Sequence, residues 1–281
     1  MFEIKMHHIQ TIVKDAGFGG TSPIIVKANN KEYILKTKED GTLQKSLGIF
    51  NELLSYQLIS YLNLNIAPQE IVYLLIDDNF IEMAQIAYNE NIIKQESLEN
   101  IKNSKGVNLG IEYINNAMDP LNKTVANKTF IKKLAYIDNY IMNCDRTKDN
   151  MNILQDKSNL KKYYAIDFGN ALVDGVLYEK ILEDGKECID ILTQGIFTNC
   201  NVTLSKRYFL KENIKKLVKK GYKNKEDIDT IRNILKEIIN KFPPEWEPLE
   251  YKDCIIEIIA LRMKNNKIFL TNESNKCPCI Y

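Results

Sequence analysis

Apolar and polar residues alternate along the beginning of the chain, a pattern typical of β-strands. The run "PIIVKANNKEYILKTK", which starts at Pro23, contains two alternating stretches that meet at Asn29-Asn30, so it predicts a β-hairpin. The run "QEIVYLLIDDNFIEMAQIA", which starts at Gln69, predicts a second hairpin that turns at Asp77-Asp78-Asn79. Between the two hairpins apolar residues recur at helical spacing, which predicts a helix with a stripe made of Leu47, Phe50 or Asn51, Leu54, Leu58 and Tyr61.

The pattern changes to helices after Ala87. One stripe of apolar residues at three- and four-residue spacing comprises Phe130, Leu134, Ile137 and Ile141. Three more helices are predicted over residues 204–220, 226–242 and 250–264. A strand-rich beginning and a helical remainder predict an α+β protein with two lobes, residues 1–87 and 88–281, joined by the segment near residues 82–89.

Composition narrows the chemistry that the chain can carry out. The only two histidines, His7 and His8, are adjacent, which argues against Ser-His-Asp and Cys-His catalysis and against histidine-ligated zinc. The six cysteines are dispersed and expected to be reduced, and the pair Cys277 and Cys279 is interpreted as incidental. Without a signal peptide or a long apolar run, the expected location is the cytoplasm, and a net charge of +1 indicates no particular partner.

Three oxygen-bearing side chains follow apolar segments in the middle of the chain. Asp145 and Asn150 lie in "CDRTKDN", just past the helix that ends near Asn143, and Asp167 leaves the second of two predicted short strands, "MNIL" and "YYAIDFG". Each of these three residues, taken alone, would suit a turn or the end of a strand. Together, Asn150 and Asp167 suit Mg²⁺, which takes oxygen ligands, and Asp145 suits the orientation of a hydroxyl that accepts a phosphoryl group.

The first half of the chain offers contacts for phosphates. Residues 17–22, here called the glycine segment, let the backbone approach an anion and contain Gly17, Gly19, Gly20, Thr21 and Ser22. Lys36 lies on a predicted strand whose neighbours Tyr33 and Leu35 face the other way, and Glu52, on the next helix, is predicted to pair with it.

These motifs together resemble the HipA-like kinase family, a distant branch of the protein-kinase-like fold. The resemblance rests on "GGTSP", "YILK", "FNELLSYQL", "NCDRTKDN", "AIDFG" and "FPPEW", which span the chain from Gly19 to Trp246. It implies a bilobal protein-kinase-like fold and an ATP- and Mg²⁺-dependent kinase acting on Ser or Thr of a protein substrate. It also implies that Asp145 is the catalytic base, that Asn150 and Asp167 bind Mg²⁺, and that Lys36 contacts the nucleotide phosphates.

The resemblance makes further predictions about single residues. "FIEMAQ" would be the hinge, with the backbone of Glu82, Met83 and Ala84 reading adenine. The family often has a histidine two residues after the catalytic aspartate, where this chain has Thr147, and Lys148 is predicted to supply positive charge to the transferring phosphoryl group. Arg146 is expected to pair inside the catalytic loop or with a neighbouring acid. Ser22, in preference to Thr21, is the predicted site of self-phosphorylation.

Other interpretations stay open at this stage. One is a small-molecule kinase that resembles the aminoglycoside or lipid kinases, and another is a pseudokinase that serves as an interaction module, although the intact set of Asp145, Asn150 and Asp167 argues against it. The basic stretch 206–225 could contact RNA or an acidic protein, but a helix with a solvated lysine face is favoured. Neither a membrane partner nor direct DNA binding is expected.

Overall fold

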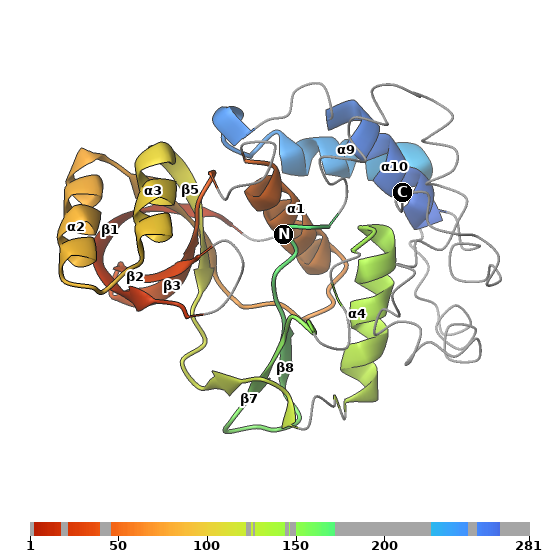
Figure 1. The fold of residues 1–281 in the computed structure, drawn as a ribbon. Helices are drawn as coiled ribbons and strands as arrows, with labels where there is room; N and C mark the ends of the chain where they lie inside the picture. Colours follow the sequence, from red (N-terminus) through yellow and green to blue (C-terminus); the bar gives the residue numbers. More distant parts are fainter. Residues whose placement is uncertain are drawn as a thin grey trace, which may run out of the picture.

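The N-terminal part of the molecule is a closed five-stranded barrel (Figure 1). The computed structural model describes residues 3–17, 22–39, 46–121, 125, 127–143, 146, 150–171, 226–246 and 252–264. The strands follow the order β1-β2-β3-β5-β4 around the barrel, with bounds β1 Lys5–Asp15, β2 Ile24–Ala28, β3 Lys31–Lys36, β4 Ile71–Ile76 and β5 Gly106–Glu112. The pairing of β1 with β4 is parallel, and the other pairings are antiparallel.

The first predicted hairpin is confirmed. β2 and β3 pair so that Ala28 lies opposite Lys31, and Asn29 and Asn30 form the turn with φ angles of 47° and 62°. Two consecutive residues with positive φ give a turn whose twist matches that of the flanking strands, and asparagine tolerates this conformation better than most side chains.

The second predicted hairpin is wrong, because a helix follows β4. Asp77 caps helix α2 (Asp78–Asn89), and its side chain accepts a hydrogen bond of 2.9 Å from the backbone N–H of Phe80. Phe80, Ala84 and Ala87 are the buried residues of α2, and their helical spacing lets one face pack into the barrel's apolar core. An aspartate before such a stripe favours a helix start over a hairpin turn.

The strand-rich lobe also extends beyond the predicted boundary at residue 87. Helix α3 (Gln95–Asn103) packs beside α2, and β5 then completes the barrel between β3 and β4. The segment near residues 82–89 is therefore part of the first lobe and does not join the lobes. The chain leaves the barrel after Glu112 and continues into the next sheet at β6 (Ala117–Met118).

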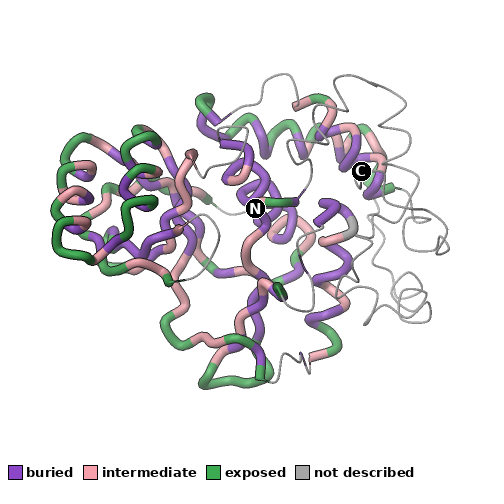
Figure 2. The backbone as a smooth tube through the Cα atoms, viewed as in Figure 1, coloured by how far each residue is buried: buried purple, intermediate pink, exposed green. Residues whose placement is uncertain are grey.

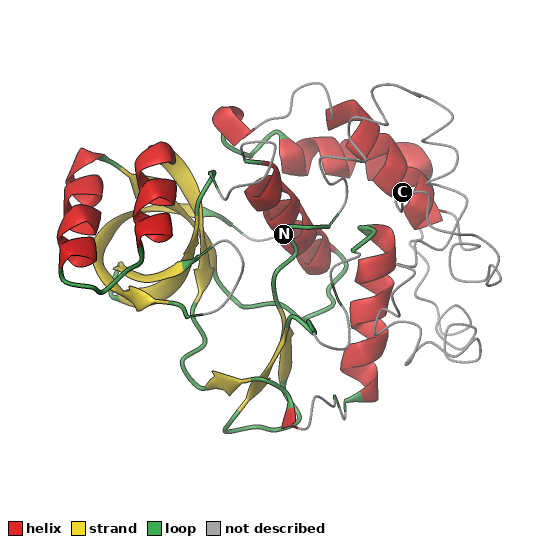
Figure 3. Ribbon diagram, viewed as in Figure 1, coloured by secondary structure: helices red, strands yellow, loops and turns green. Residues whose placement is uncertain are grey.

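The remaining described residues form a small sheet and several helices, as Figure 3 shows. The antiparallel sheet has the order β6-β7-β8, with β7 at Ile153–Asp156 and β8 at Tyr163–Ala165, which confirms the predicted strand pair. Helix α4 (Lys128–Tyr140) buries the predicted stripe. Helices α9 (Ile228–Ile239) and α10 (Lys252–Lys264) confirm two of the three later predictions. The third, over 204–220, lies outside the described residues, as do the basic stretch 206–225 and the pair Cys277 and Cys279. Among the helices that the structure describes, none has both the length and the apolar character needed to cross a membrane.

Helix α1 (Leu47–Tyr61) occupies the middle of the molecule, between the barrel and the C-terminal helices (Figures 1 and 2). All its residues from Ile49 to Ile59 are buried, so it is enclosed on every side and not only along the predicted stripe. It contacts α4, α9 and β5, and the rings of Phe50 and Phe242 meet edge to face with centroids 5.3 Å apart. A helix buried on all faces has little freedom to move, so Glu52 is carried by a fixed element.

The segment after α9 ties the helical part to the barrel. The 3₁₀ turn η2 (Pro244–Trp246) ends in a buried tryptophan, whose Nε1 donates a 2.7 Å hydrogen bond to the carbonyl of Val107 in β5. On β4, the hydroxyl of Tyr73 donates to the carbonyl of Lys241 at 3.1 Å, and its ring meets that of Trp246 edge to face. The two parts of the chain are thus linked by apolar and polar contacts.

Candidate active site

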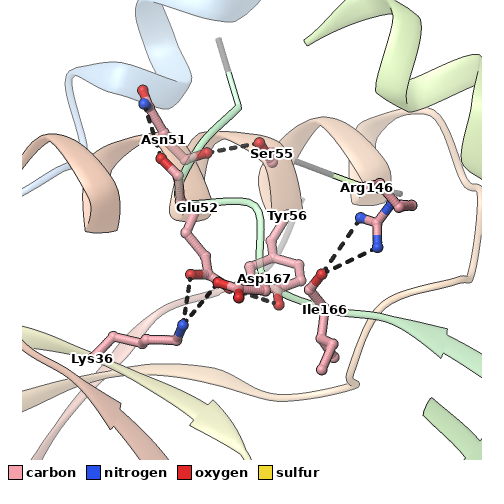
Figure 4. Close-up of polar contacts among 9 residues, drawn as sticks. Lys36, Asn51, Glu52, Ser55, Tyr56, Arg146, Ile166 and Asp167 are labelled. Atoms are coloured by element: carbon pink, nitrogen blue, oxygen red, sulfur yellow. Dashed lines mark hydrogen bonds and ion pairs between the residues drawn. The ribbon is translucent and has the colours of Figure 1, made fainter. Parts of the chain in front are cut away.

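Lys36, the last residue of β3, is held between two carboxylates (Figure 4). Its Nζ donates a 2.9 Å hydrogen bond to Oδ1 of Asp167 and lies 3.7 Å from Oε2 of Glu52. The lysine side chain is 17% exposed, whereas the adjacent Leu35 is buried inside the barrel. The predicted pairing of Lys36 with Glu52 is confirmed, and the ammonium group points to a place where β3, α1 and the end of β8 meet.

Glu52 is a buried carboxylate that has partners for both oxygens. Its side chain is 2% exposed, Oε2 faces Lys36, and Oε1 accepts a 3.1 Å hydrogen bond from the hydroxyl of Tyr56 one turn along α1. Burial raises the pKa of Glu52; Lys36 opposes this rise, and the nearby Asp167 adds to it. Tyr56 was not singled out from the sequence, because a tyrosine in a buried helix looks like an ordinary core residue.

Asp167 stands just after β8 with its backbone in the left-handed region, at a φ of 59°. Burial opposes ionisation of its carboxyl, but the charge of Lys36, the hydrogen bond from Lys36 and the charge of Arg146 outweigh burial and lower the pKa of Asp167. Its side chain is 37% exposed. Asp167 therefore presents an ionised oxygen ligand at a partly open position.

The residues after Asp167 fix this unusual backbone conformation. The Phe168 ring is buried and meets the Tyr56 ring edge to face with centroids 5.3 Å apart. The side-chain amide of Asn51 donates a 3.2 Å hydrogen bond to the carbonyl of Gly169. A non-glycine residue with positive φ persists where its surroundings hold it, and such positions concentrate at functional sites. Both contacts come from α1, so the same helix holds Glu52 and the segment of Asp167.

Arg146 joins the segment that follows α4 to the end of β8. It is 1% exposed, its Nε donates to Oδ2 of Asp138 at 3.0 Å, and its guanidinium lies 5.0 Å from the centroid of Phe168. The guanidinium also donates to the carbonyls of Met151 (2.9 Å) and Ile166 (3.4 Å). Its predicted internal pairing is confirmed.

The acid that pairs with Arg146 was not identified from the sequence. Burial raises the pKa of Asp138, and the charge of Arg146 and hydrogen bonds from Asn143 and Arg146 oppose the rise. The available signal was an aspartate one position after the buried Ile137 of the α4 stripe, close enough to the end of the helix to meet a following arginine.

Asn150 and Asp167 lie at the same end of the β7–β8 pair. Ile153 is opposite Ala165 in the register, and the N–H of Ile166 donates to the carbonyl of Asn152 at 3.0 Å. The antiparallel pairing thus brings the start of the first strand next to the end of the second, and Asn150 is exposed there. Asp145 and Lys148 lie outside the described residues, so their predicted roles stay predictions.

Ser22, the last residue of the glycine segment, lies at the same end of the barrel as Lys36. Ile24 lies opposite Leu35 in the β2–β3 register, which puts Ser22 near the end of β3. Gly17 has a φ of 75°, a conformation that favours glycine, and Gly19, Gly20 and Thr21 lie outside the described residues. The hydroxyl of Ser22 donates to Glu96 at the start of α3.

The predicted hinge does not agree with the structure. Glu82, Met83 and Ala84 lie inside α2, where backbone N–H and C=O groups bond to each other along the helix. Ala84 is moreover buried against the barrel core. The peptide groups of these residues are therefore not free to read adenine.

A lysine oriented by a buried glutamate, beside an ionised aspartate that leaves a strand, is an arrangement with which kinases hold nucleotide phosphates and a metal ion. The fold and site thus define a kinase-type phosphotransferase. The chain belongs to the HipA-like kinase family, whose model matches residues 9–269. Use of ATP is a property of that family.

Comparison with solved structures gives a match to the crystal structure of the Helicobacter pylori proinflammatory kinase CtkA. The two sequences are 15% identical, the TM-score is 0.47, and the match covers 93% of this chain and 98% of that chain. The curated proteins contain no match to this sequence.

Proposed function

We propose that this protein is a protein kinase with a bilobal kinase-like fold, which transfers the γ-phosphoryl group of ATP, with Mg²⁺, to a Ser or Thr hydroxyl of a protein substrate. The observation that carries the proposal is the position of the Lys36 ammonium, 2.9 Å from Asp167 and 3.7 Å from the buried Glu52. Residues from three separate parts of the chain converge there on one charged centre.

The residues present suit Mg²⁺. Asp167 is ionised and partly exposed, and Asn150 supplies a neutral oxygen at the same end of the β7–β8 pair. Within the described ranges no group of three or more His, Cys, Asp or Glu side chains is arranged to hold a metal. One carboxylate and one amide fit Mg²⁺, because this ion keeps several waters and takes further oxygens from substrate phosphates. When bound by Asp167 and Asn150, it would neutralise charge on the phosphates.

Lys36 would bind the nucleotide phosphates, and Glu52 keeps its ammonium pointed toward them. Tyr56 holds Glu52 in turn, so the orientation of the lysine depends on α1 as a whole. The glycine segment would offer its backbone N–H groups to the same phosphates. Such positioning supplies most of the catalysis in phosphoryl transfer, because the protein takes little covalent part in the reaction.

Asp145 would accept the proton of the acceptor hydroxyl. As the bond from the hydroxyl oxygen to the γ-phosphorus forms, the bond from that phosphorus to the bridging oxygen of ADP breaks, and the proton passes to Asp145. Lys148 would stabilise negative charge on the transferring group. Arg146, next to Asp145 in sequence, is anchored by four backbone and side-chain partners.

Incubation of the purified protein with Mg²⁺, γ-labelled ATP and a cell lysate tests the proposal. We expect label on Ser or Thr of protein, no label with Asp145→Ala, and normal labelling with the control Asp78→Ala, since Asp78 is a 78% exposed acid on α2. Asp145→Ala should retain Mg-ATP binding, and Asp167→Ala should lose both binding and transfer. Label confined to small molecules would contradict a protein acceptor, and ATP binding without any transfer would contradict a kinase.

A further inference from the structure

In the sequence, helices α2 and α3 lie between barrel strands β4 and β5. In the structure, this α2–α3 hairpin lies beside the residues at which the glycine segment begins and ends. Helices α2 and α3 are side by side, and α2 packs against β1 (Figure 1). Their connection, residues 90–94, runs past the end of β1. None of the residues predicted to touch phosphates belongs to it.

The connection holds the first end of the glycine segment. Asp15, the last residue of β1, donates its backbone N–H to the carbonyl of Ile92 at 3.2 Å. Its Oδ1 accepts from the N–H of Gly17 at 2.7 Å and lies 3.8 Å from Nζ of Lys94. The exit from β1 is thus bound to the α2–α3 connection through both backbone and side chain.

The first turn of α3 holds the second end. The Ser22 hydroxyl donates to Oε2 of Glu96, and the Ser22 carbonyl accepts from the hydroxyl of the buried Ser97 at 3.0 Å. Ser22 has a φ of 46°, which a non-glycine residue keeps only where neighbours hold it. The N–H of Ala16 also donates to the carbonyl of Pro23 at 3.0 Å, which joins the two ends to each other.

We infer that the α2–α3 hairpin anchors both ends of the glycine segment for nucleotide binding, and that Glu96 is a positioning residue of this kinase. The inference rests on the proposed function of the glycine segment. A segment whose two ends are already fixed has less conformational freedom to lose on binding an anion, and this preorganisation strengthens binding. Because Glu96 acts on the loop and not on the transferring group, its loss should weaken ground-state and transition-state binding alike.

The test compares Glu96→Ala, Glu96→Gln and the control Glu99→Ala. Glu99 lies on the same helix, is exposed, and accepts a hydrogen bond from Gln95 at 2.8 Å. We expect Glu96→Ala to raise both the KM for ATP and the Kd for Mg-ATP by roughly three- to tenfold, with kcat within about twofold of wild type. Glu96→Gln keeps an acceptor oxygen and should recover much of the affinity, and Glu99→Ala should match wild type. All three variants should share one melting temperature.

Two results would overturn the inference. Wild-type KM and Kd in Glu96→Ala would remove Glu96 from nucleotide binding, and a fall in kcat and melting temperature at unchanged KM would make it a structural residue only. A failure of the proposed function would give a different result: the wild-type protein would bind no Mg-ATP, or Lys36→Ala would bind Mg-ATP as tightly as wild type.

Discussion

Lys36 of β3 donates a hydrogen bond of 2.9 Å to Asp167, a residue 131 positions farther along the chain. This bond crosses from the barrel to the strand pair of the second part of the molecule, and Glu52 of α1 faces the same ammonium group. Charged groups from three elements therefore meet at one point. A substitution of Lys36, Glu52 or Asp167 should therefore affect the other two residues.

Replacement of Lys36 by alanine should weaken Mg-ATP binding by more than about tenfold, which corresponds to about 1.4 kcal/mol. The reason is the loss of the Lys36 ammonium group, which Glu52 and Asp167 orient together. Titration calorimetry measures the effect. The matched control is Lys31→Ala at the other end of β3, whose side chain is 60% exposed and pairs with Glu70. Equal affinity in the wild type and in Lys36→Ala would take Lys36 out of the nucleotide site.

The stability of the variants Glu52→Gln and Asp167→Asn should depend on pH in different ways. Burial raises the pKa of Glu52 above its ordinary 4.5, so the folded state holds its proton more tightly than the unfolded state. As pH rises from about 4.5, ionisation of the buried Glu52 lowers the stability of the wild type, and Glu52→Gln escapes this loss. The melting temperature of Glu52→Gln relative to wild type should therefore increase between pH 5 and pH 8.

The opposite sign applies to Asp167. Its pKa is lowered, so its stabilising contribution is complete above the ordinary value of 3.8 and is lost only as pH falls through the lower folded value. The stability difference between Asp167→Asn and wild type should thus change from pH 5 to pH 8 only through Glu52, whose pKa falls when the nearby Asp167 charge is removed, and this change should be smaller than that of Glu52→Gln. Melting curves of the two variants at several pH values measure both trends, and an equal pH dependence of the two would contradict the assignment.

Tyr56→Phe should lower the phosphoryl-transfer rate while the protein remains folded. The change removes the hydroxyl that donates to Glu52 and keeps the ring that meets Phe168 edge to face. The loss of one hydrogen bond should cost about 1 kcal/mol of unfolding free energy in urea titrations. Tyr73→Phe removes a comparable hydroxyl that donates to Lys241, remote from the charged centre, and should retain transfer. If both variants slow transfer equally, the Tyr56 hydroxyl has no particular connection with Glu52.

Arg146→Met should destabilise the fold by about 3–5 kcal/mol, because it leaves the largely buried Asp138 without its cation and three backbone carbonyls without their donor. Asp138→Asn should cost less, since an amide still accepts from the guanidinium. The double variant should be destabilised by less than the sum of the two single destabilisations, as expected for residues in direct contact. Denaturant titration of the four proteins gives the coupling energy, and simple additivity would show that the pair does not act as a unit.

Local patterns determined much of what the sequence predicts correctly. Asn29-Asn30 between alternating runs identifies the hairpin because the turn needs two residues that accept positive φ. The stripe of α4 follows from its apolar spacing. Lys36 and Asp167 stand out because a charged residue at the end of an apolar strand needs a partner or a ligand. In each case the information is contained in a few neighbouring residues.

Tertiary structure decided what those patterns leave open. "IDDNFIEMAQIA" contains signals of both a strand turn and a helix start, and packing of Phe80, Ala84 and Ala87 against the barrel core selects the helix. The predicted adenine hinge was wrong for that reason, and the predicted boundary at residue 87 was wrong because β5 completes the barrel after α2 and α3. The burial of Glu52 depends on elements from distant parts of the chain that surround α1. Periodicity tells which face of an element is apolar. Which other element covers that face is decided only when the elements pack together, as they do in the closed barrel and around α1.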